Sequence, residues 1–351
     1  MGLIPDLPDD VARECLLRAS YNQFPVISSV CKSWKREISL TEFFRQRKAS
    51  CHSQKLLVMA QAGVDPVREN GPGKLLSIPV YRISVLQPGS GLWTELPPVP
   101  GLPNGLPLFC RLAAVGSDLV VLGGLDPVTW QASDSIFIFS FLTSTWRTGE
   151  SMPGVRRSFF GCASDCNRTV FVAGGHDEDK NALTSAIAYD VAEDIWVPLP
   201  DMARERDECS AIFHGGRLHV IGGYATEEQG QFSKTAESFD LGTWQWGPVV
   251  EDLLNSATCH PVCAGDEYGR LYACCGGDVV MLRENTWQKV GKIPDDVEKV
   301  AYVAVWGGKI LVMGSDANVA YAGGEKGSEW VKVEAHEKYR GHVQTACCLE
   351  L

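Results

Sequence analysis

Two hydrophobic patterns divide this chain. Near the N-terminus, apolar positions recur at helical spacing, first around Val11, Leu16 and Leu17, after Pro8 and two acidic residues that favour a helix start. A second stripe in FPVISSVCKSWKREI and a third segment, LTEFFRQRKAS, follow. From residue 55 onward the apolar residues come in short runs typical of β-strands. The pattern predicts a small α-helical unit over residues 1–45 and a mainly β body over residues 55–351.

The β body contains an internal repeat. Four apolar runs end in glycine pairs: DLVVLGG, TVFVAGG, RLHVIGG and RLYACCGG. The pairs begin at Gly123, Gly174, Gly222 and Gly276, so successive pairs lie 51, 48 and 54 residues apart. A second short strand follows each pair. Glycine at a strand end permits backbone angles and close approaches that a Cβ would forbid.

A tryptophan completes each repeat. The series is Trp93, Trp146, Trp196, Trp244, Trp287 and Trp330. Strand, glycine pair, strand and tryptophan at about 50 residues is the kelch period, and the body resembles a kelch β-propeller. Sheets of four short strands cannot bury both faces alone and stack around an axis, with the indole rings filling the wedges between them. Six tryptophans predict six blades.

The first blade lacks an inner strand. It begins with KLLVMAQ (55–61) and VYRISVL (80–86), whereas HVQTACCLEL (342–351) follows the last tryptophan as a solitary β-segment. We expect residues 342–351 to close the ring as the innermost strand of the first blade, because closure removes exposed sheet edges. The last two repeats are shorter, and Gly314 stands there without a partner glycine.

Composition limits the function classes. The 351 residues carry a formal net charge of -11 and no run of five or six Lys/Arg, which argues against binding to nucleic acid or an anionic membrane. The first ten residues have no secretory pattern, and no apolar run approaches ~18 residues. Thirteen cysteines, an odd number, fit reduced thiols. We therefore expect a cytoplasmic and/or nuclear protein.

The helical unit resembles an F-box. LPDDVARECLLR, FPVISSVCKSWKREI and the following FF match its Leu-Pro start, Leu-rich helix and Val-Cys-Lys-x-Trp helix. The resemblance implies docking to a Skp-family adaptor and, through it, to a cullin ubiquitin ligase. It marks as adaptor-binding residues Leu7, Pro8, Val11, Leu16, Leu17, Phe24, Pro25, Val30, Cys31 and Trp34. Leu16, Val30 and Trp34 can equally be core residues, whereas Leu7 and Pro8 lie at the edge of the unit.

The whole chain resembles the plant F-box/kelch group. Segments such as FVAGGHDEDKNAL and ERDECSAIFHGGRLHVIGGYATEEQGQFSKTAESFD match the branch implicated in turnover of phenylalanine ammonia-lyase, in phenylpropanoid metabolism, and of type-B response regulators, in cytokinin signalling. The resemblance implies a substrate receptor of an SCF-type (Skp-cullin-F-box) ubiquitin ligase that is not itself an enzyme. Two alternatives are a kelch scaffold without a role in degradation and, less favoured, a propeller enzyme.

Target recognition is expected on propeller loops. Loops between second and third strands share one end with the connections between blades. Mixed charges suit a protein partner there, and exposed aromatic rings would supply anchors. The candidates are Trp130, Arg156, Arg157, His176, Asp177, Asp179, Lys180, Arg204, Arg206, Tyr224, Glu227 and Glu228. Arg157 and Arg206 occupy equivalent repeat positions and can instead be structural ties between blades, and the acidic turn can be merely solvated.

No cofactor or metal is expected. The histidines are scattered, and the pairs Cys162/Cys166 and Cys259/Cys263 lack partners at zinc-site spacing. Buried, reduced thiols on inner strands explain these cysteines better.

Overall fold

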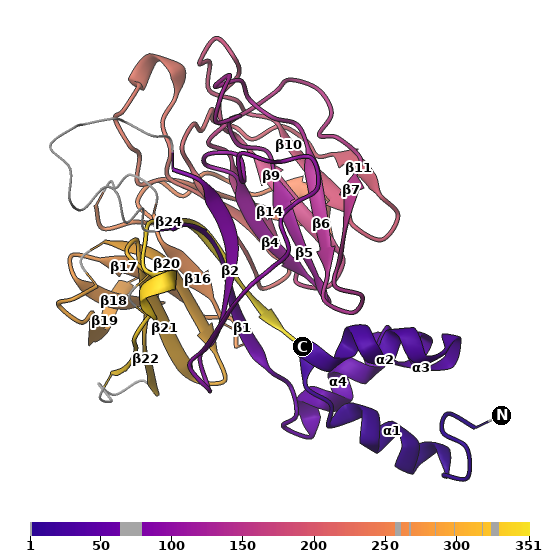
Figure 1. Cartoon of the computed structure of the whole chain (residues 1–351). Coiled ribbons are helices and arrows are strands. Elements are labelled where there is room, and N and C mark those ends of the chain that lie inside the picture. The colour runs from indigo at the N-terminus through magenta and orange to yellow at the C-terminus, as the bar shows by residue number, and fades with distance from the viewer. Residues whose placement is uncertain are drawn as a thin grey trace, which may run out of the picture.

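The computed structural model describes residues 2–63, 79–256, 261–266, 268–284, 286–297, 299–317, 319–323 and 330–351. Four α-helices come first, followed by strands that pair into antiparallel sheets arranged around an axis (Figure 1). The prediction of a mainly β propeller preceded by a small helical module is confirmed. No helix in these ranges is both long and apolar enough to cross a bilayer.

The helical module spans four helices and one short 3-10 turn. These elements are α1 (Asp9–Leu17), η1 (Tyr21–Gln23), α2 (Phe24–Val30), α3 (Lys32–Ile38) and α4 (Thr41–Ala49). Pro8 precedes α1, and Asp9 and Asp10 lie in its first turn, where the helix dipole favours negative charge. Cys31 separates α2 from α3, and its sulfur accepts a hydrogen bond from Trp34 N. The local sequence thus fixes where these helices begin.

The described strands form six four-stranded sheets, numbered here as blades in chain order. Blade 1 contains β1 (Lys55–Ala62), β2 (Tyr81–Gln87), β3 (Leu92–Glu95) and β24 (Val343–Glu350). Blade 2 contains β4 (Arg111–Val115), β5 (Asp118–Leu122), β6 (Ile136–Ser140) and β7 (Thr145–Gly149). Blade 3 contains β8 (Gly161–Ser164), β9 (Thr169–Ala173), β10 (Ala186–Asp190) and β11 (Ile195–Pro198).

The later blades follow the same order from inner to outer strand. Blade 4 contains β12 (Ser210–His214), β13 (Arg217–Ile221), β14 (Ala236–Asp240) and β15 (Gln245–Trp246). Blade 5 contains β16 (Cys263–Gly265), β17 (Leu271–Cys275), β18 (Asp278–Arg283) and β19 (Thr286–Lys292). Blade 6 contains β20 (Val300–Trp306), β21 (Lys309–Gly314), β22 (Val319–Gly323) and β23 (Val331–Val333).

The inner strands form a closed cycle. They contact one another in the order β24, β4, β8, β12, β16, β20 and again β24. β24 comes from the far end of the chain and pairs antiparallel with β1, from Lys55 opposite Glu350 to Gln61 opposite Val343. Blade 1 therefore joins the beginning and the end of the propeller sequence in a single sheet.

The core lies in the wedges between adjacent blades, where separate groups of buried apolar side chains pack. A tryptophan at or next to the outer strand packs beside these wedges, and its Nε1–H donates a hydrogen bond to a backbone carbonyl of the preceding repeat. The pairs are Trp146 to Pro97, Trp196 to Glu150, Trp246 to Pro200, Trp287 to Leu253 and Trp330 to Lys292. The repeat tryptophan of blade 4 is thus Trp246, and the prediction of Trp244 is wrong. Trp244 lies in the preceding turn with its backbone at φ 58°.

The glycine pairs bring neighbouring loops together. A Cβ on Gly175, at φ 83°, would lie 2.4 Å from the carbonyl oxygen of Ser158. Gly276 and Gly277 form a two-residue turn between Cys275 and Asp278, so blade 5 has no long loop at the place where blades 2 to 4 carry one. The shorter connection explains why the later repeats match the pattern weakly.

Candidate functional site

The two ends of the propeller carry different structures. The chain leaves α4 at residue 49 and enters β1 at Lys55, beside the end of β24, so the helical module lies at that end (Figure 1). We call this the module end. Strand direction places the second-to-third strand loops and the connections between blades at the opposite end, which we call the loop end. The adaptor-binding candidates and the target-binding candidates therefore lie at opposite ends.

The helical module carries exposed apolar side chains on α1 and α2, which together we call its apolar face. Val11 on α1 is 45% exposed and Val30 on α2 is 55% exposed. Leu7, Pro8, Val26 and Cys31 are exposed as well. The sequence pattern does not mark Val26 as an adaptor-binding residue, although it is the most exposed valine of this face. Exposed apolar residues gathered on one small module indicate a surface that a partner covers.

Other adaptor-binding candidates are core residues, and the prediction that they contact an adaptor is wrong. Leu16, Leu17 and Phe24 are buried in one cluster with Phe43 and Leu351. The helix faces that carry them pack on α4 and on the propeller. Pro25 and Trp34 are half-buried, and the indole Nε1 of Trp34 donates to Leu3 O at 2.6 Å. They are available to a partner only at their edges.

A buried arginine joins the module to the propeller. The guanidinium of Arg47 donates to the carbonyl oxygens of Leu17, Ala19 and His52, and Nη2 lies 3.4 Å from Leu351 O. Burial lowers the pKa of Arg47 to about 10. Tyr21 packs edge-on against Phe141 of the propeller with ring centroids 6.1 Å apart. The apolar cluster continues across the joint, so the module is held in one position.

At the loop end, two arginines that the sequence predicts to contact a target are instead buried, and they hydrogen-bond to groups within the chain. Arg157 donates to the carbonyls of Gly174 and Ser185, and burial lowers its pKa to about 10. Arg206 is 1% exposed and bonds Glu237 at 3.1 Å. Tyr224 is buried too, and its hydroxyl donates to Glu208. Burial removes Arg157, Arg206 and Tyr224 from the target-binding set.

The exposed arginines of the rim have carboxylate partners within the chain. Arg156 Nε lies 3.2 Å from Asp134 Oδ2. Arg204 makes two hydrogen bonds to Glu251, of 2.7 and 3.1 Å. A partner's carboxylate would therefore compete with an existing pair at either position.

The remaining rim candidates stay accessible. Trp130 is 57% exposed, with its backbone at φ 59°. The side-chain amide of Asn181 and the backbone amides of Asn181 and Asp179 donate hydrogen bonds to Asp177, and these bonds lower the pKa of its carboxyl group. Four of the predicted target-binding residues in the two acidic loops are exposed: Asp179, Lys180, Glu227 and Glu228. Their role in target binding stays a prediction.

His176 takes part in a network that sequence reasoning missed. Its Nε2 lies 2.8 Å from Ser158 Oγ, and its Nδ1 lies 2.8 Å from Asp207 Oδ2. The order Ser, His, Asp is that of a nucleophilic triad. However, Ser158 is 2% exposed, and its backbone N–H and C=O both bond His176. A substrate carbonyl cannot reach this hydroxyl, so the network ties blade 3 to blade 4.

Comparisons with known proteins match both the helical module and the propeller. The F-box domain model matches residues 4–46, and the Kelch motif matches residues 108–153, 156–203 and 205–249. The chain is 64% identical to the F-box/kelch-repeat proteins At1g80440 and At1g15670 of Arabidopsis thaliana, with 100% of each chain covered. The chain belongs to the F-box/kelch-repeat family. It is also 32% identical to At2g44130 of the same plant, covering 82% of this chain and 75% of that protein.

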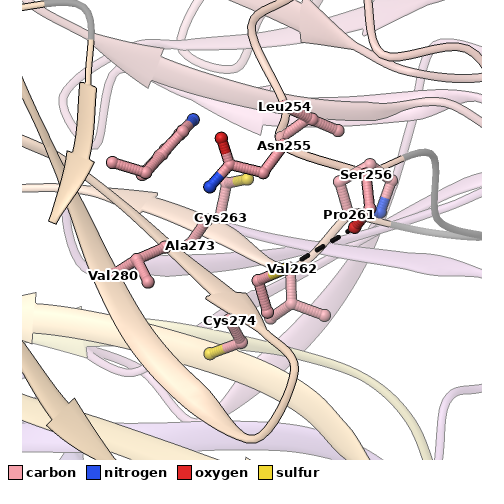
Figure 2. Close-up of a pocket in the computed structure, with 11 residues that line it drawn as sticks. Leu254, Asn255, Ser256, Pro261, Val262, Cys263, Ala273, Cys274 and Val280 are labelled. Carbon is pink, nitrogen blue, oxygen red and sulfur yellow. Dashed lines mark hydrogen bonds between the residues drawn. The ribbon is translucent and has the colours of Figure 1, made fainter. Parts of the chain in front are cut away.

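The kelch propeller contains a central channel of about 730 Å³ that opens beside Lys48 and Lys55 at the module end. Small side chains and thiols of the inner strands line it, among them Cys162 and Cys348. A smaller cavity of about 20 Å³ lies between blade 5 and the connection that precedes it, next to Cys263 and Cys274 (Figure 2). Burial raises the pKa of both these thiols to about 12, so they stay protonated.

Within the described residues, no three His, Cys, Asp or Glu side chains are arranged to hold a metal ion. Cys259, from one of the spaced pairs, lies outside those residues. The described residues thus provide no metal-ligand cluster, and the exposed surfaces at the two ends of the propeller are the candidate sites.

Proposed function

We propose that this F-box/kelch-repeat protein is the substrate-recognition subunit of an SCF-type ubiquitin ligase. The exposed apolar face of the F-box, centred on Val11 and Val30, is the observation that carries the proposal. F-box domains bind Skp-family adaptors, and kelch propellers bind targets. The adaptor covers this face, while a target binds at the loop end.

The joint between the two halves supports the same function. Because Arg47 and the shared apolar cluster hold the F-box in one orientation, a target at the loop end keeps a defined position relative to the ligase. Ubiquitin transfer to a bound target then becomes effectively intramolecular and gains from a high local concentration. No group of this chain needs to take part in the chemistry.

Adaptor binding tests the first half of the proposal. Changing Val11 and Val30 together to Glu places two charges on the exposed face, and we expect affinity for a Skp-family adaptor to fall by at least about 100-fold. Stability should change by only about 0.5 kcal/mol per site, because both side chains are already exposed. Titration calorimetry with purified adaptor and thermal unfolding measure the two effects.

Val155→Glu is the matched control, because Val155 is equally exposed but lies at the loop end. It should bind the adaptor normally. Undiminished adaptor binding by the Val11→Glu/Val30→Glu protein would contradict the assignment of this face.

We further propose phenylalanine ammonia-lyase and type-B response regulators as the targets, degraded in the cytoplasm or nucleus. The proposal rests on the resemblance of several segments, including residues 205–240, to the branch implicated in their turnover. Half-lives of both proteins in plant cells, with this chain or its Val11→Glu/Val30→Glu variant, test it. If the targets bind but their half-lives do not depend on the F-box face, the chain is a scaffold without a role in degradation.

A further inference from the structure

An arginine at the loop end has no carboxylate partner among the described residues. Arg111 is the first residue of the inner strand β4, and its side chain is half-buried. Its Nε donates to the carbonyl oxygen of Phe160 at 3.1 Å, and within the described part of the chain its Nη1 and Nη2 groups have no partner. The exposed arginines Arg156 and Arg204, in contrast, each pair with a carboxylate. We call the positions at which the inner strands begin the inner rim.

The thiols close to Arg111 are neutral. Burial raises the pKa of Cys110 and of Cys162 to about 12, although the charge of Arg111 acts in the opposite direction. Burial raises the pKa of Cys209 too, again against the effect of Arg111. Protonated thiols do not compensate a guanidinium, so the positive charge of Arg111 can attract a carboxylate from outside the chain.

An exposed aromatic ring lies near Arg111. Phe109, two residues earlier, is 45% exposed. Its ring packs against that of Phe159 with centroids 4.8 Å apart, and its backbone N–H donates to Gln344 on β24 at 2.8 Å. The ring contact and the Arg111 hydrogen bond join the same two segments, so residues 109–111 and 159–160 lie side by side. The inner rim thus combines an apolar surface with a cation at this place.

Lys299 supplies a second cation on the other side of β24. It lies directly ahead of β20, is exposed, and has no ion-pair partner among the described residues. Burial and, to a smaller extent, the charge of Lys299 lower the pKa of His342, which directly precedes β24. Because β20 and β4 both contact β24 in the cycle of inner strands, Lys299 and Arg111 flank that strand.

The carboxylates of the loop end lie on the far side of the rim or are bonded locally. Asp207 and Glu208 lie ahead of β12, which is opposite β24 in the cycle of inner strands, and both bond within the chain. Asp126 and Asp177 accept hydrogen bonds from the amides of their own turns. The inner rim is therefore asymmetric, with cations beside β24 and carboxylates beside β12.

We propose that Arg111, Lys299 and Phe109 bind an acidic segment of the target that carries an aromatic or aliphatic side chain beside Asp or Glu. This inference rests on the proposed function, because it names the chemistry of the target at the loop end. One target carboxylate accepts hydrogen bonds from Nη1 and Nη2 of Arg111, and the apolar side chain packs against Phe109. A second carboxylate reaches Lys299.

Arg111→Gln isolates the charge from the structural bond. The glutamine amide keeps a donor for Phe160 O but removes the positive charge, so we expect a folded protein whose affinity for an acidic peptide falls at least about tenfold. Lys299→Gln changes an exposed side chain and should weaken the same binding about threefold at an unchanged unfolding temperature.

The test uses a random dodecapeptide display library selected on the full-length protein, followed by anisotropy measurements with individual synthetic peptides. We expect enriched peptides with a net negative charge and an aromatic or aliphatic residue, bound more weakly as the salt concentration rises. Lys234→Gln is the matched control, since Lys234 is an exposed lysine at the loop end between β13 and β14, in blade 4. It should bind these peptides as the wild-type protein does.

Enrichment of basic peptides, acidic peptides that bind Arg111→Gln as tightly as the wild-type protein, or no enrichment would each overturn this inference. If Arg111→Gln unfolds at a lower temperature, Lys299→Gln decides, and its unchanged affinity would then overturn the inference. The library contains no adaptor, so failure of the proposed ligase function would appear separately, as absent binding to the Skp-family adaptor.

Discussion

Deleting residues 342–351 is expected to abolish cooperative folding of the propeller. The deletion removes β24, which is the innermost strand of blade 1 and contacts the inner strands of blades 2 and 6. It also removes three large buried apolar side chains, Val343, Leu349 and Leu351, and with them their contribution to the core. At roughly 1.5–3 kcal/mol each, this loss alone is comparable to the total stability of many domains, about 5–15 kcal/mol.

The deletion also removes backbone hydrogen bonds. β24 pairs with β1 along its length, so its absence leaves the edge of β1 unpaired. The joint with the F-box weakens as well, because Leu351 belongs to the same apolar cluster as Leu17 and Phe24. We expect loss of near-ultraviolet circular dichroism and no cooperative thermal transition.

Leu349→Ala is a graded control for the deletion. It removes one buried side chain but keeps the strand, so a cooperative transition should persist with stability lowered by about 2–5 kcal/mol. If the shortened chain instead unfolds cooperatively at the wild-type temperature, the ring does not depend on β24.

The sequence predicts the propeller well because each repeat places the same residue type under the same constraint. Gly175 must be glycine where a loop approaches within 2.4 Å of a would-be Cβ. Trp146 and Trp196 each reach the carbonyl of the previous repeat from their outer strands. The misassignment of Trp244 arises because two tryptophans lie two residues apart, and only the strand register of β15 distinguishes them.

Docking residues in the F-box are harder to predict. Leu16 and Val11 belong to the same helical stripe, but α1 turns Leu16 toward the core and Val11 toward solvent. The sequence does not reveal that the propeller covers part of the module. Similarly, Ser158, His176 and Asp207 come from three segments in two blades, so their network depends on how the blades pack.

The arginines of blade 4 show most clearly why the loop-end site was only partly predicted. Arg204 and Arg206 are two residues apart in one connection, and both pair with glutamate. Arg204 and Glu251 are exposed to solvent. Arg206 and Glu237 are 1% and 0% exposed, and Arg206 also donates to the carbonyls of Gly222 and Thr235. Residue type alone cannot distinguish a solvated pair from a buried one.

Arg206→Met is therefore expected to destabilise the protein by about 3–5 kcal/mol, because it leaves the charge of Glu237 buried without its partner. Arg204→Met should cost at most about 1 kcal/mol, since the Arg204–Glu251 pair is exposed to solvent. Urea-induced unfolding of each variant, followed by tryptophan fluorescence, measures both changes in the free energy of unfolding.

The double variant Arg206→Met/Glu237→Met distinguishes a buried charge from general loss of packing. Without either charge, the blade should recover much of the stability lost in Arg206→Met, although the amides of Ala203 and Arg204 lose the carboxylate that accepts from them. Equal stability of Arg206→Met and Arg204→Met would show that Arg206 is not the tie that its burial indicates. It would also return Arg206 to the residues considered for target binding.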